Sequence, residues 1–385
     1  MTEQRLNEFE LAPGGPVDRL QRKLRITTED SLRLVPRAVI AGLVAWGPLL
    51  VLSLLRPNPS ADISFLQDVA AHVRFLLIVP LLVMAEGAIR ARSHATVIEF
   101  LAAGLVDNED VERFDAARRL GRRLIDSTLI ELVLIALSVL FVVGAIHGVL
   151  SEQTVFWFER TDGDTLSSAG WWYAVVATPM LVFLFVRWAW RYLVWWWFLG
   201  RVARLDLKLA GAHPDRMGGL GFVPFQHATF SLLNFAFMCA VAGVAANRIL
   251  YADASLRQFQ TPLVSIIVLG VIVGIAPMLV FSRLLVAERR EGWMTYGRFA
   301  SDYVRRFEHK WLRRPSGEEA LGSGDIQSLA DLGGSLERVM SLRPVAIDRR
   351  LVVSFVIAGA VPALPLMLTV MPLREIVKML LKAMM

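Results

Sequence analysis

Residues 129–150 read LIELVLIALSVLFVVGAIHGVL, with one carboxylate and one imidazole in an otherwise apolar run. A transmembrane helix needs about 20 such residues, because each residue rises about 1.5 Å and the hydrocarbon core is about 30 Å thick. Further apolar stretches of this kind lie at residues 38–55, 75–89, 171–191, 228–249, 262–286 and 351–371. The sequence therefore predicts an all-α fold, a polytopic transmembrane helical bundle of about seven spans with cytoplasmic amphipathic helices.

The composition excludes an ordinary soluble protein. Hydrophobic residues make up 55% of the 385-residue chain, which contains 11 tryptophans, a residue enriched where membranes meet water. The single cysteine, Cys239, lies inside the fifth apolar stretch, so neither an intramolecular disulfide nor a cysteine zinc site can form. The positive residues are concentrated in alternate loops, which indicates membrane topology and not nucleic-acid binding. The sequence indicates no cofactor and no metal site.

Lysine and arginine gather in four segments of the chain. They number seven before the first span, seven at residues 90–123, four at 201–216 and twelve at 289–350. Because cytoplasmic loops are enriched in these residues, the pattern places the N-terminus and the loops after spans 2, 4 and 6 in the cytoplasm, and the C-terminus outside. An alternative is open for span 7, which Pro362 and Pro365 interrupt: it is broken or re-entrant, and the basic amphipathic tail returns to the cytoplasm.

These predictions divide the chain into six parts. They are a cytoplasmic N-terminal segment (1–37), spans 1 and 2 (38–90), a cytoplasmic helical hairpin (91–128), spans 3 to 6 (129–287), cytoplasmic amphipathic helices with a linker (288–350), and span 7 with an interfacial C-terminal helix (351–385).

The two long cytoplasmic loops are predicted to be helical. Residues 91–126 contain two apolar series at helical spacing, and Asp107 or Asn108 is expected to cap the second arm. In the last loop, an aromatic stripe at residues 293–311 is expected to continue span 6 as one amphipathic helix. Asp325 is expected to cap a further short helix that ends before Gly333 and Gly334.

Three interpretations of the aromatic stripe at residues 293–311 are open. It packs on the helical hairpin of the first loop, it lies on the membrane surface, or it forms a subunit interface of a homo-oligomer. Packing within the chain is the usual role of such a stripe and is favoured. The same helices also offer surfaces on which a cytoplasmic protein partner can dock, and the bilayer itself is the partner of the spans.

Ionisable residues inside the spans are candidates for a functional site, because an Arg, Lys or Asp at the bilayer centre costs about 2.5–3.5 kcal/mol. Arg187 and Arg191 lie four residues apart on one face of span 4, near its cytoplasmic end. Their side chains either snorkel to the interface, which is favoured, or form an anion-attracting ring at the mouth of a pore. A possible intramembrane polar network consists of Glu86, Glu131, Asn234 and Arg283, in which either carboxylate can pair with Arg187 or Arg283.

The loop between spans 4 and 5 contains HPDRMGGLGF at residues 213–222. Glycines in such density permit positive φ and expose backbone N–H groups, as in anion-binding loops, although dinucleotide and P-loop spacings are absent. The favoured interpretation is a glycine-rich turn pinned by polar side chains, and the alternative is a ligand site. The residues concerned are His213, Asp215, Arg216, Gly218, Gly219 and Gly221.

The chain resembles a group of uncharacterised bacterial multi-pass membrane proteins. The resemblance rests on residues 213–222, on RWAWRYLVWWWFLGRVARLDLKL at 187–209 and on GSGDIQSLADL at 322–332, and it covers most of residues 70–385. It implies a bacterial plasma (inner) membrane location, whereas the cytoplasmic N-terminus is expected from the distribution of Lys and Arg. It implies no activity.

The sequence favours two function classes over the others. A channel or transporter with a basic cytoplasmic mouth is favoured slightly, because several spans contain polar or kinked positions. The alternative is a membrane-embedded scaffold or sensor that docks partners through its cytoplasmic helices. An enzyme is the least favoured class, since the chain contains no Ser–Lys, paired-Asp or HExxH constellation and hence no candidate catalytic residue.

Overall fold

The computed structural model describes residues 34–58, 61–149, 157–158, 166–313 and 324–367, and for residues 146–149 it describes the backbone alone. Nearly all of the predicted N-terminal segment, the core of the predicted linker and the C-terminal interfacial helix therefore lie outside the described residues. The described part of the chain is helical and contains no strand. Isolated bridge residues occur at Ile63, Val106, Leu166 and Leu207, and Val106 and Leu207 form an antiparallel bridge.

Seven helical segments in the described residues are long and apolar enough to cross a membrane. The chain is thus a multi-pass membrane protein with an all-α bundle, as the sequence predicts. The segments, in chain order, are α3 (Leu34–Leu55); α4 (Val69–His72), η3 (Val73–Ile78) and α5 (Val79–Ala102); α7 (Thr128–Val149); α8 (Ser168–Trp172), η4 (Tyr173–Ala177) and α9 (Thr178–Val202); α10 (Phe222–His227), η5 (Ala228–Phe230) and α11 (Ser231–Tyr251); α12 (Leu256–Ile275), η6 (Ala276–Phe281), α13 (Ser282–Phe307) and η7 (Glu308–Arg313); and α15 (Arg349–Ala360), η8 (Val361–Ala363) and α16 (Leu364–Met367). Outside them lie η2 (Phe65–Gln67), α6 (Val111–Ile125) and α14 (Gly324–Met340).

Prolines account for several irregular turns inside the spans. The π-helical segments η3 and η4 end just before Pro80 and Pro179, and the 3-10 turns η6 and η8 contain Pro277 and Pro362. Proline lacks an N–H and its ring clashes with the carbonyl four residues earlier, so the helix changes its hydrogen-bond pattern there and then continues.

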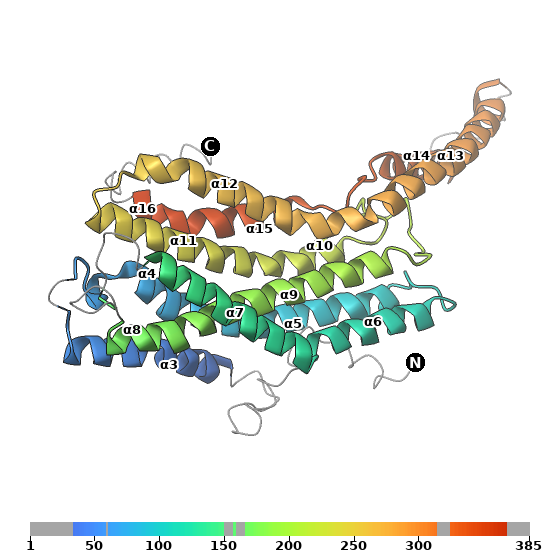
Figure 1. Cartoon of the computed structure of the whole chain (residues 1–385). Coiled ribbons are helices and arrows are strands. Elements are labelled where there is room, and N and C mark those ends of the chain that lie inside the picture. Colours follow the sequence, from blue (N-terminus) through green and yellow to red (C-terminus); the bar gives the residue numbers. More distant parts are fainter. Residues whose placement is uncertain (1–33, 59–60, 150–156, 159–165, 314–323, 368–385) are drawn as a thin grey trace.

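The seven spans lie side by side, and their connections alternate between two ends of the bundle (Figure 1). Helix α3 packs on α5, α6 and α7 pack on α9, and α12 and α11 pack on α15. The α5–α6 and α9–α10 connections share one end with a projecting hairpin made of α13 and α14, here called the hairpin end (Figure 1). Helices α4, α8 and α16 lie at the opposite end.

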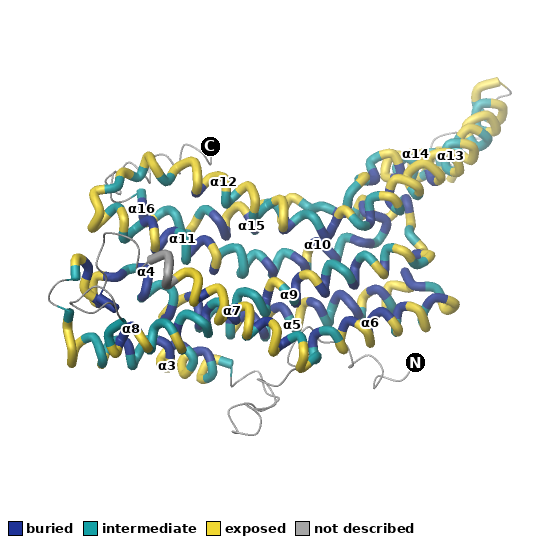
Figure 2. Tube along the Cα trace, viewed as in Figure 1, coloured by how far each residue is buried: buried dark blue, intermediate teal, exposed yellow. Residues whose placement is uncertain are grey.

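Burial follows the pattern of a membrane protein. Large aromatic side chains fill the centre, among them Phe75, Phe114, Trp195 and Phe281. The outer surfaces of α3, α7 and α12 are also apolar, and Leu140 is 68% exposed (Figure 2). Exposed apolar surface of this extent is stable where the surroundings are lipid chains.

The helices are longer than the apolar stretches that predict them. Span 2 is predicted at 75–89 but is helical from Val69 to Ala102, so the first arm of the predicted hairpin is the end of span 2 itself. The second arm, α6, begins after Asp110, which is its N-cap in place of the predicted Asp107 or Asn108. Polar residues end an apolar window without ending a helix, because they retain good helix propensity.

The region of the last loop differs from the prediction in two respects. Helix α13 packs along α14 and not on the first-loop hairpin, with Gly292 close to Val339. Helix α14 runs through Gly333 and Gly334 to Met340, because packing of this kind offsets the cost of about 1 kcal/mol for each helical glycine. Asp325 lies in the first turn of α14, where it accepts hydrogen bonds from Lys310 (2.8 Å) and Trp311 (3.0 Å).

Candidate functional site

A cluster of charged side chains lies inside the bundle between α3, α5, α7 and α9. Arg191 Nη1 donates a hydrogen bond to Glu86 Oε1 at 2.9 Å, and the side chains are only 3% and 9% exposed. Two further guanidinium groups approach Glu86, that of Arg187 at 4.0 Å and that of Arg37 at 3.8 Å. Glu131 of α7 is buried and close enough to act on Arg191 electrostatically. We call these five residues the charge cluster.

Helix geometry explains how α9 builds its part of the charge cluster. Arg187 and Arg191 are four residues apart and so project from one face of α9. Between them, Trp188 donates a hydrogen bond from Nε1 to the carbonyl of Leu82 at 3.0 Å, which fixes α9 against α5. The Arg191 guanidinium lies 5.2 Å from the Trp188 ring centroid, a cation–π contact. Nη2 of Arg191 is buried and has no hydrogen-bond partner among the described residues.

The position of Arg191 differs from the favoured sequence interpretation. Arg191 does not snorkel to a surface, because its guanidinium is held inside the bundle by Glu86. Of the two expected partners, Arg187 lies 4.0 Å from Glu86, but the closer partner of Glu86 is Arg191, at 2.9 Å. The charge cluster thus contains three arginines and two carboxylates.

The two remaining members of the predicted polar network lie elsewhere. Asn234 donates a hydrogen bond from Nδ2 to the carbonyl of Phe355 at 3.0 Å, and so ties α11 to α15. Arg283 is exposed near the start of α13 and forms no ion pair with a described residue. The structure thus brings Glu86 and Glu131 together with Arg191, but not with Asn234 or Arg283.

In the glycine-rich loop, the backbone folds around a single carboxylate. Asp215 Oδ1 accepts hydrogen bonds from the N–H groups of Met217 (2.8 Å) and Gly219 (3.2 Å), and Oδ2 accepts one from Gly221 (2.8 Å). His213 Nδ1 lies 2.8 Å from Oδ1. Gly218 and Gly219 have φ values of 66° and 95°, which an L side chain rarely adopts.

These contacts set the ionisation of Asp215. Partial burial is the largest single influence on the pKa of Asp215, and it raises the pKa. The backbone N–H donors of Met217, Gly221 and Gly219 and the side chain of His213 lower it. Together these donors outweigh burial, so the pKa lies below the ordinary value of 3.8. The carboxylate is therefore charged at neutral pH. The backbone N–H groups that a ligand anion would use are occupied by this side chain.

The loop also joins three parts of the hairpin end. The carbonyl of Arg216, whose φ is 57°, accepts a hydrogen bond from Arg343 N at 2.9 Å. Lys208 N donates to the carbonyl of Leu105 at 2.8 Å, which connects the loop region to the α5–α6 connection. Gly219 packs against the Leu105 side chain. The glycine-rich loop thus acts as a structural joint between the α9–α10, α5–α6 and α14–α15 connections.

Two polar residues that organise the bundle are absent from the sequence-based candidates. His227 accepts a hydrogen bond at Nδ1 from Trp195 Nε1 (3.2 Å), so its Nε2 is the donor to the carbonyl of Gly274 (2.9 Å). At the opposite end, Asp68 accepts from Trp157 (2.9 Å) and Asn247 (2.7 Å). The only sequence signal for Asp68 is its place just before a helix, and His227 has none, since its partners are distant in the chain.

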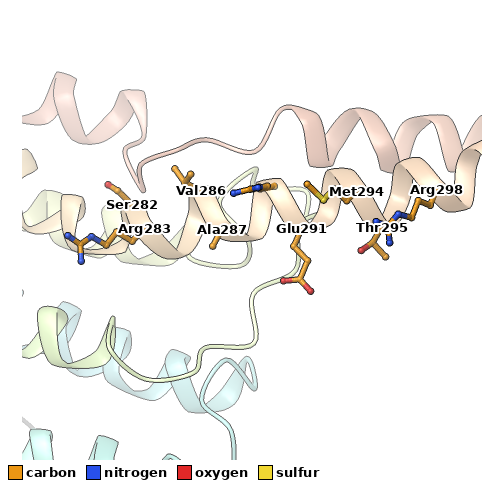
Figure 3. A pocket seen from close by; sticks show the side chains of 9 residues that line it. Ser282, Arg283, Val286, Ala287, Glu291, Met294, Thr295 and Arg298 are labelled. Atoms are coloured by element: carbon orange, nitrogen blue, oxygen red, sulfur yellow. The ribbon is translucent and has the colours of Figure 1, made fainter.

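An open groove follows the side of α13 that faces away from α14 (Figure 3). It has a volume of about 800 Å³, and all of the residues that line it belong to α13. Figure 3 shows Val286 and Glu291 on opposite sides of this helix. We define the outer face of α13 by residues at helical spacing on this side, namely Arg283, Val286, Arg290, Met294, Arg298, Val304 and Arg305.

No family model matches the chain, and neither a curated protein nor a solved structure matches it. Among the described residues, no group of three or more His, Cys, Asp or Glu side chains is placed to hold a metal ion.

Proposed function

We propose that this membrane protein is a docking scaffold in the bacterial inner membrane, and that its α13–α14 hairpin binds a cytoplasmic protein. The carrying observation is the outer face of α13, on which exposed apolar side chains and exposed arginines lie together and which no described residue covers. The enrichment of Lys and Arg in the connections at the hairpin end supports a cytoplasmic hairpin and a cytoplasmic N-terminus.

The apolar part of the surface has the size and residue types of a docking site. Val286 is 51% exposed and Met294 46% exposed on the outer face, and Trp293 beside them is 59% exposed. Tryptophan and methionine are typical anchors of protein interfaces, where one large side chain in a pocket contributes much of the binding energy. A hairpin that stands away from the bundle (Figure 1) can bring these anchors to a soluble domain.

The charges around these anchors define the chemistry of the partner. Arg290, Arg298 and Arg305 are exposed and form no ion pair with a described residue. By contrast, Arg306 is on another side of α13 and is held by Asp302 at 2.8 Å. Uncompensated guanidinium groups beside apolar anchors fit a protein surface with an apolar groove and an acidic rim.

Site-specific photo-crosslinking in intact cells tests this proposal. A photoreactive side chain at position 294 is expected to form an adduct with one soluble protein, whereas the same group at exposed Ser328 of α14 is expected to form none. Charge reversal by Arg290→Glu and Arg298→Glu is expected to reduce the adduct at least tenfold, and Arg306→Glu to leave it within twofold, because Arg306 lies outside the outer face.

Each other outcome of the crosslinking contradicts the docking proposal. Adducts with lipid alone would place the outer face in the membrane surface. Adducts between two copies of the chain would make it a homo-oligomer interface. An adduct equally reduced by Arg306→Glu would reflect total charge and no specific face.

A channel or transporter with a basic cytoplasmic mouth is the second candidate. It is favoured by one observation, the buried positive charge of Arg191, whose Nη2 has no hydrogen-bond partner among the described residues. A buried cationic group is a typical element of an anion pathway. The scaffold is preferred because Glu86 and Glu131 compensate most of this charge inside the bundle.

A further inference from the structure

Helix α6 carries four arginines on one side, close to the point where the chain enters the membrane as α7. Together with Asp126 they line an open depression of about 240 Å³. The arginines form two pairs with a spacing of four residues, which places both members of a pair on the same side of the helix; the pairs are Arg118 with Arg122 and Arg119 with Arg123. We call this surface the arginine face of α6.

The two arginine pairs differ in their partners. Arg118 and Arg122 each lie within 3.4 Å of a carboxylate oxygen from the same stretch of chain. Arg119 and Arg123 are exposed and form no ion pair with a described residue. Like charges four residues apart on a helix repel each other. An anion that lies between Arg119 and Arg123 would remove this repulsion.

The arginine face lies at the level of the membrane surface. Helix α6 ends at Ile125, and the span α7 begins at Thr128. Leu129, in the first turn of α7, is already 72% exposed, as expected of a side chain that contacts lipid. It follows Arg123 by six positions, or about 9 Å along a helical path, and the headgroup layer on each side of the hydrocarbon core is about 5–8 Å thick. The end of the arginine face therefore lies beside the lipid headgroups.

Contacts with α9 hold the arginine face in place. The opposite side of α6 packs on α9, where the Phe114 ring meets the Phe198 ring edge to face at 5.7 Å. Near the end of α6, Trp190 donates a hydrogen bond from Nε1 to the carbonyl of Leu124 at 3.2 Å. Because the helix is fixed in this way, binding of a ligand orders the arginine side chains and leaves the backbone unchanged.

We propose that the arginine face of α6 binds the headgroup of one anionic phospholipid from the leaflet at the hairpin end, with the phosphate between Arg119 and Arg123. Guanidinium groups bind phosphate oxygens through paired hydrogen bonds. Basic segments directly beside a span attract anionic lipids. A zwitterionic headgroup is disfavoured, because its ammonium group would approach guanidinium groups that no described carboxylate compensates.

Lipid retention by the purified full-length protein tests this site. Native mass spectrometry of the detergent-solubilised protein, with equal amounts of phosphatidylglycerol and phosphatidylcholine of the same chains, is expected to show preferential retention of phosphatidylglycerol. Arg119→Gln and Arg123→Gln are each expected to weaken this retention roughly fivefold. Arg113→Gln is the matched control and is expected to leave retention within twofold, because Arg113 is held by Asp110 at 3.0 Å and lies about 15 Å before Arg123 along α6.

A variant with the opposite effect separates binding from damage to the fold. Asp126→Asn removes a negative charge from the depression, and it is expected to increase the retention of phosphatidylglycerol at least twofold. Reduced retention in this variant, equal retention of the two lipids by the wild type, or a loss in Arg113→Gln as large as that in Arg123→Gln would overturn the proposal. Retention of soluble glycerol phosphate as strong as that of the lipid would also overturn it, because the ligand would then be a free phosphate.

Discussion

Replacement of Glu86 by glutamine is expected to destabilise the bundle by about 3–5 kcal/mol. Glu86 is buried and is the shared partner of Arg191, Arg187 and Arg37. Its neutralisation removes the counter-charge that the three guanidinium groups share in a region from which water is largely excluded. The measurement is unfolding of the purified protein in detergent.

The double variant Glu86→Gln with Arg191→Gln supplies the control for this experiment. Because it removes both members of the closest pair, it is expected to be more stable than Glu86→Gln alone. Glu291→Gln, on the exposed surface of α13, removes the same charge outside the bundle and is expected to be neutral within about 0.5 kcal/mol. Equal stability of Glu86→Gln and the wild type would show that the charge cluster does not depend on Glu86.

Asp215→Asn is expected to cost about 2–4 kcal/mol, because hydrogen bonds to charged groups contribute roughly 1.5–3 kcal/mol each. The amide oxygen of asparagine can still accept hydrogen bonds from the N–H groups of Met217 and Gly219. The amide NH₂ group, however, would face the N–H of Gly221, so two donors would meet and that hydrogen bond would be lost. Unfolding in detergent at pH 7 measures the loss. Asp331→Asn on exposed α14 is the matched control and is expected to change stability by less than about 0.5 kcal/mol.

The same variant gives a pH dependence with a defined sign. The pKa of Asp215 in the folded protein lies below its ordinary value of 3.8, so its contribution is fully present above about pH 3.8 and is lost as the pH falls through the folded pKa. The stability difference between wild type and Asp215→Asn is therefore expected to shrink as the pH falls below about 3.8. A difference that grows as the pH falls below 3.8 would contradict the loop geometry.

The spans could be predicted from the sequence because a membrane helix depends on local composition. The hydropathy of a window such as residues 129–150 indicates the free energy of transferring that segment into lipid, and this free energy does not depend on residues that are distant in the chain. The lengths of the helices could not be predicted in this way. Span 2 and α13 continue as helices beyond the apolar stretch, where the limit is set by a turn such as that at Gly104 and not by hydropathy.

The candidate site could be predicted only in part, because its contacts depend on how helices that are distant in the chain pack together. A carboxylate in span 2 and two arginines in span 4 indicated an ion pair, but the choice of Arg191 and the addition of Arg37 depend on how α3, α5 and α9 pack. In the glycine-rich loop the residue types indicated a pinned turn, and they did not reveal that Asp215 alone holds three backbone donors. The outer face of α13 could not be predicted, because it depends on the packing of α14 against the other side of that helix.

Ion flux across liposomes tests most directly whether the seven-helix bundle is an anchor for the hairpin or a pathway through the membrane. Protease protection first shows that the purified protein is inserted in the liposomes. Because Glu86 and Glu131 compensate the buried arginines within the bundle, the inserted protein is expected to give no more ion flux than protein-free liposomes. This holds under anion gradients and under cation gradients. Anion flux above that background, lost or altered in selectivity by Arg187→Gln but not by Arg298→Gln, would contradict the scaffold and establish a pathway past the charge cluster.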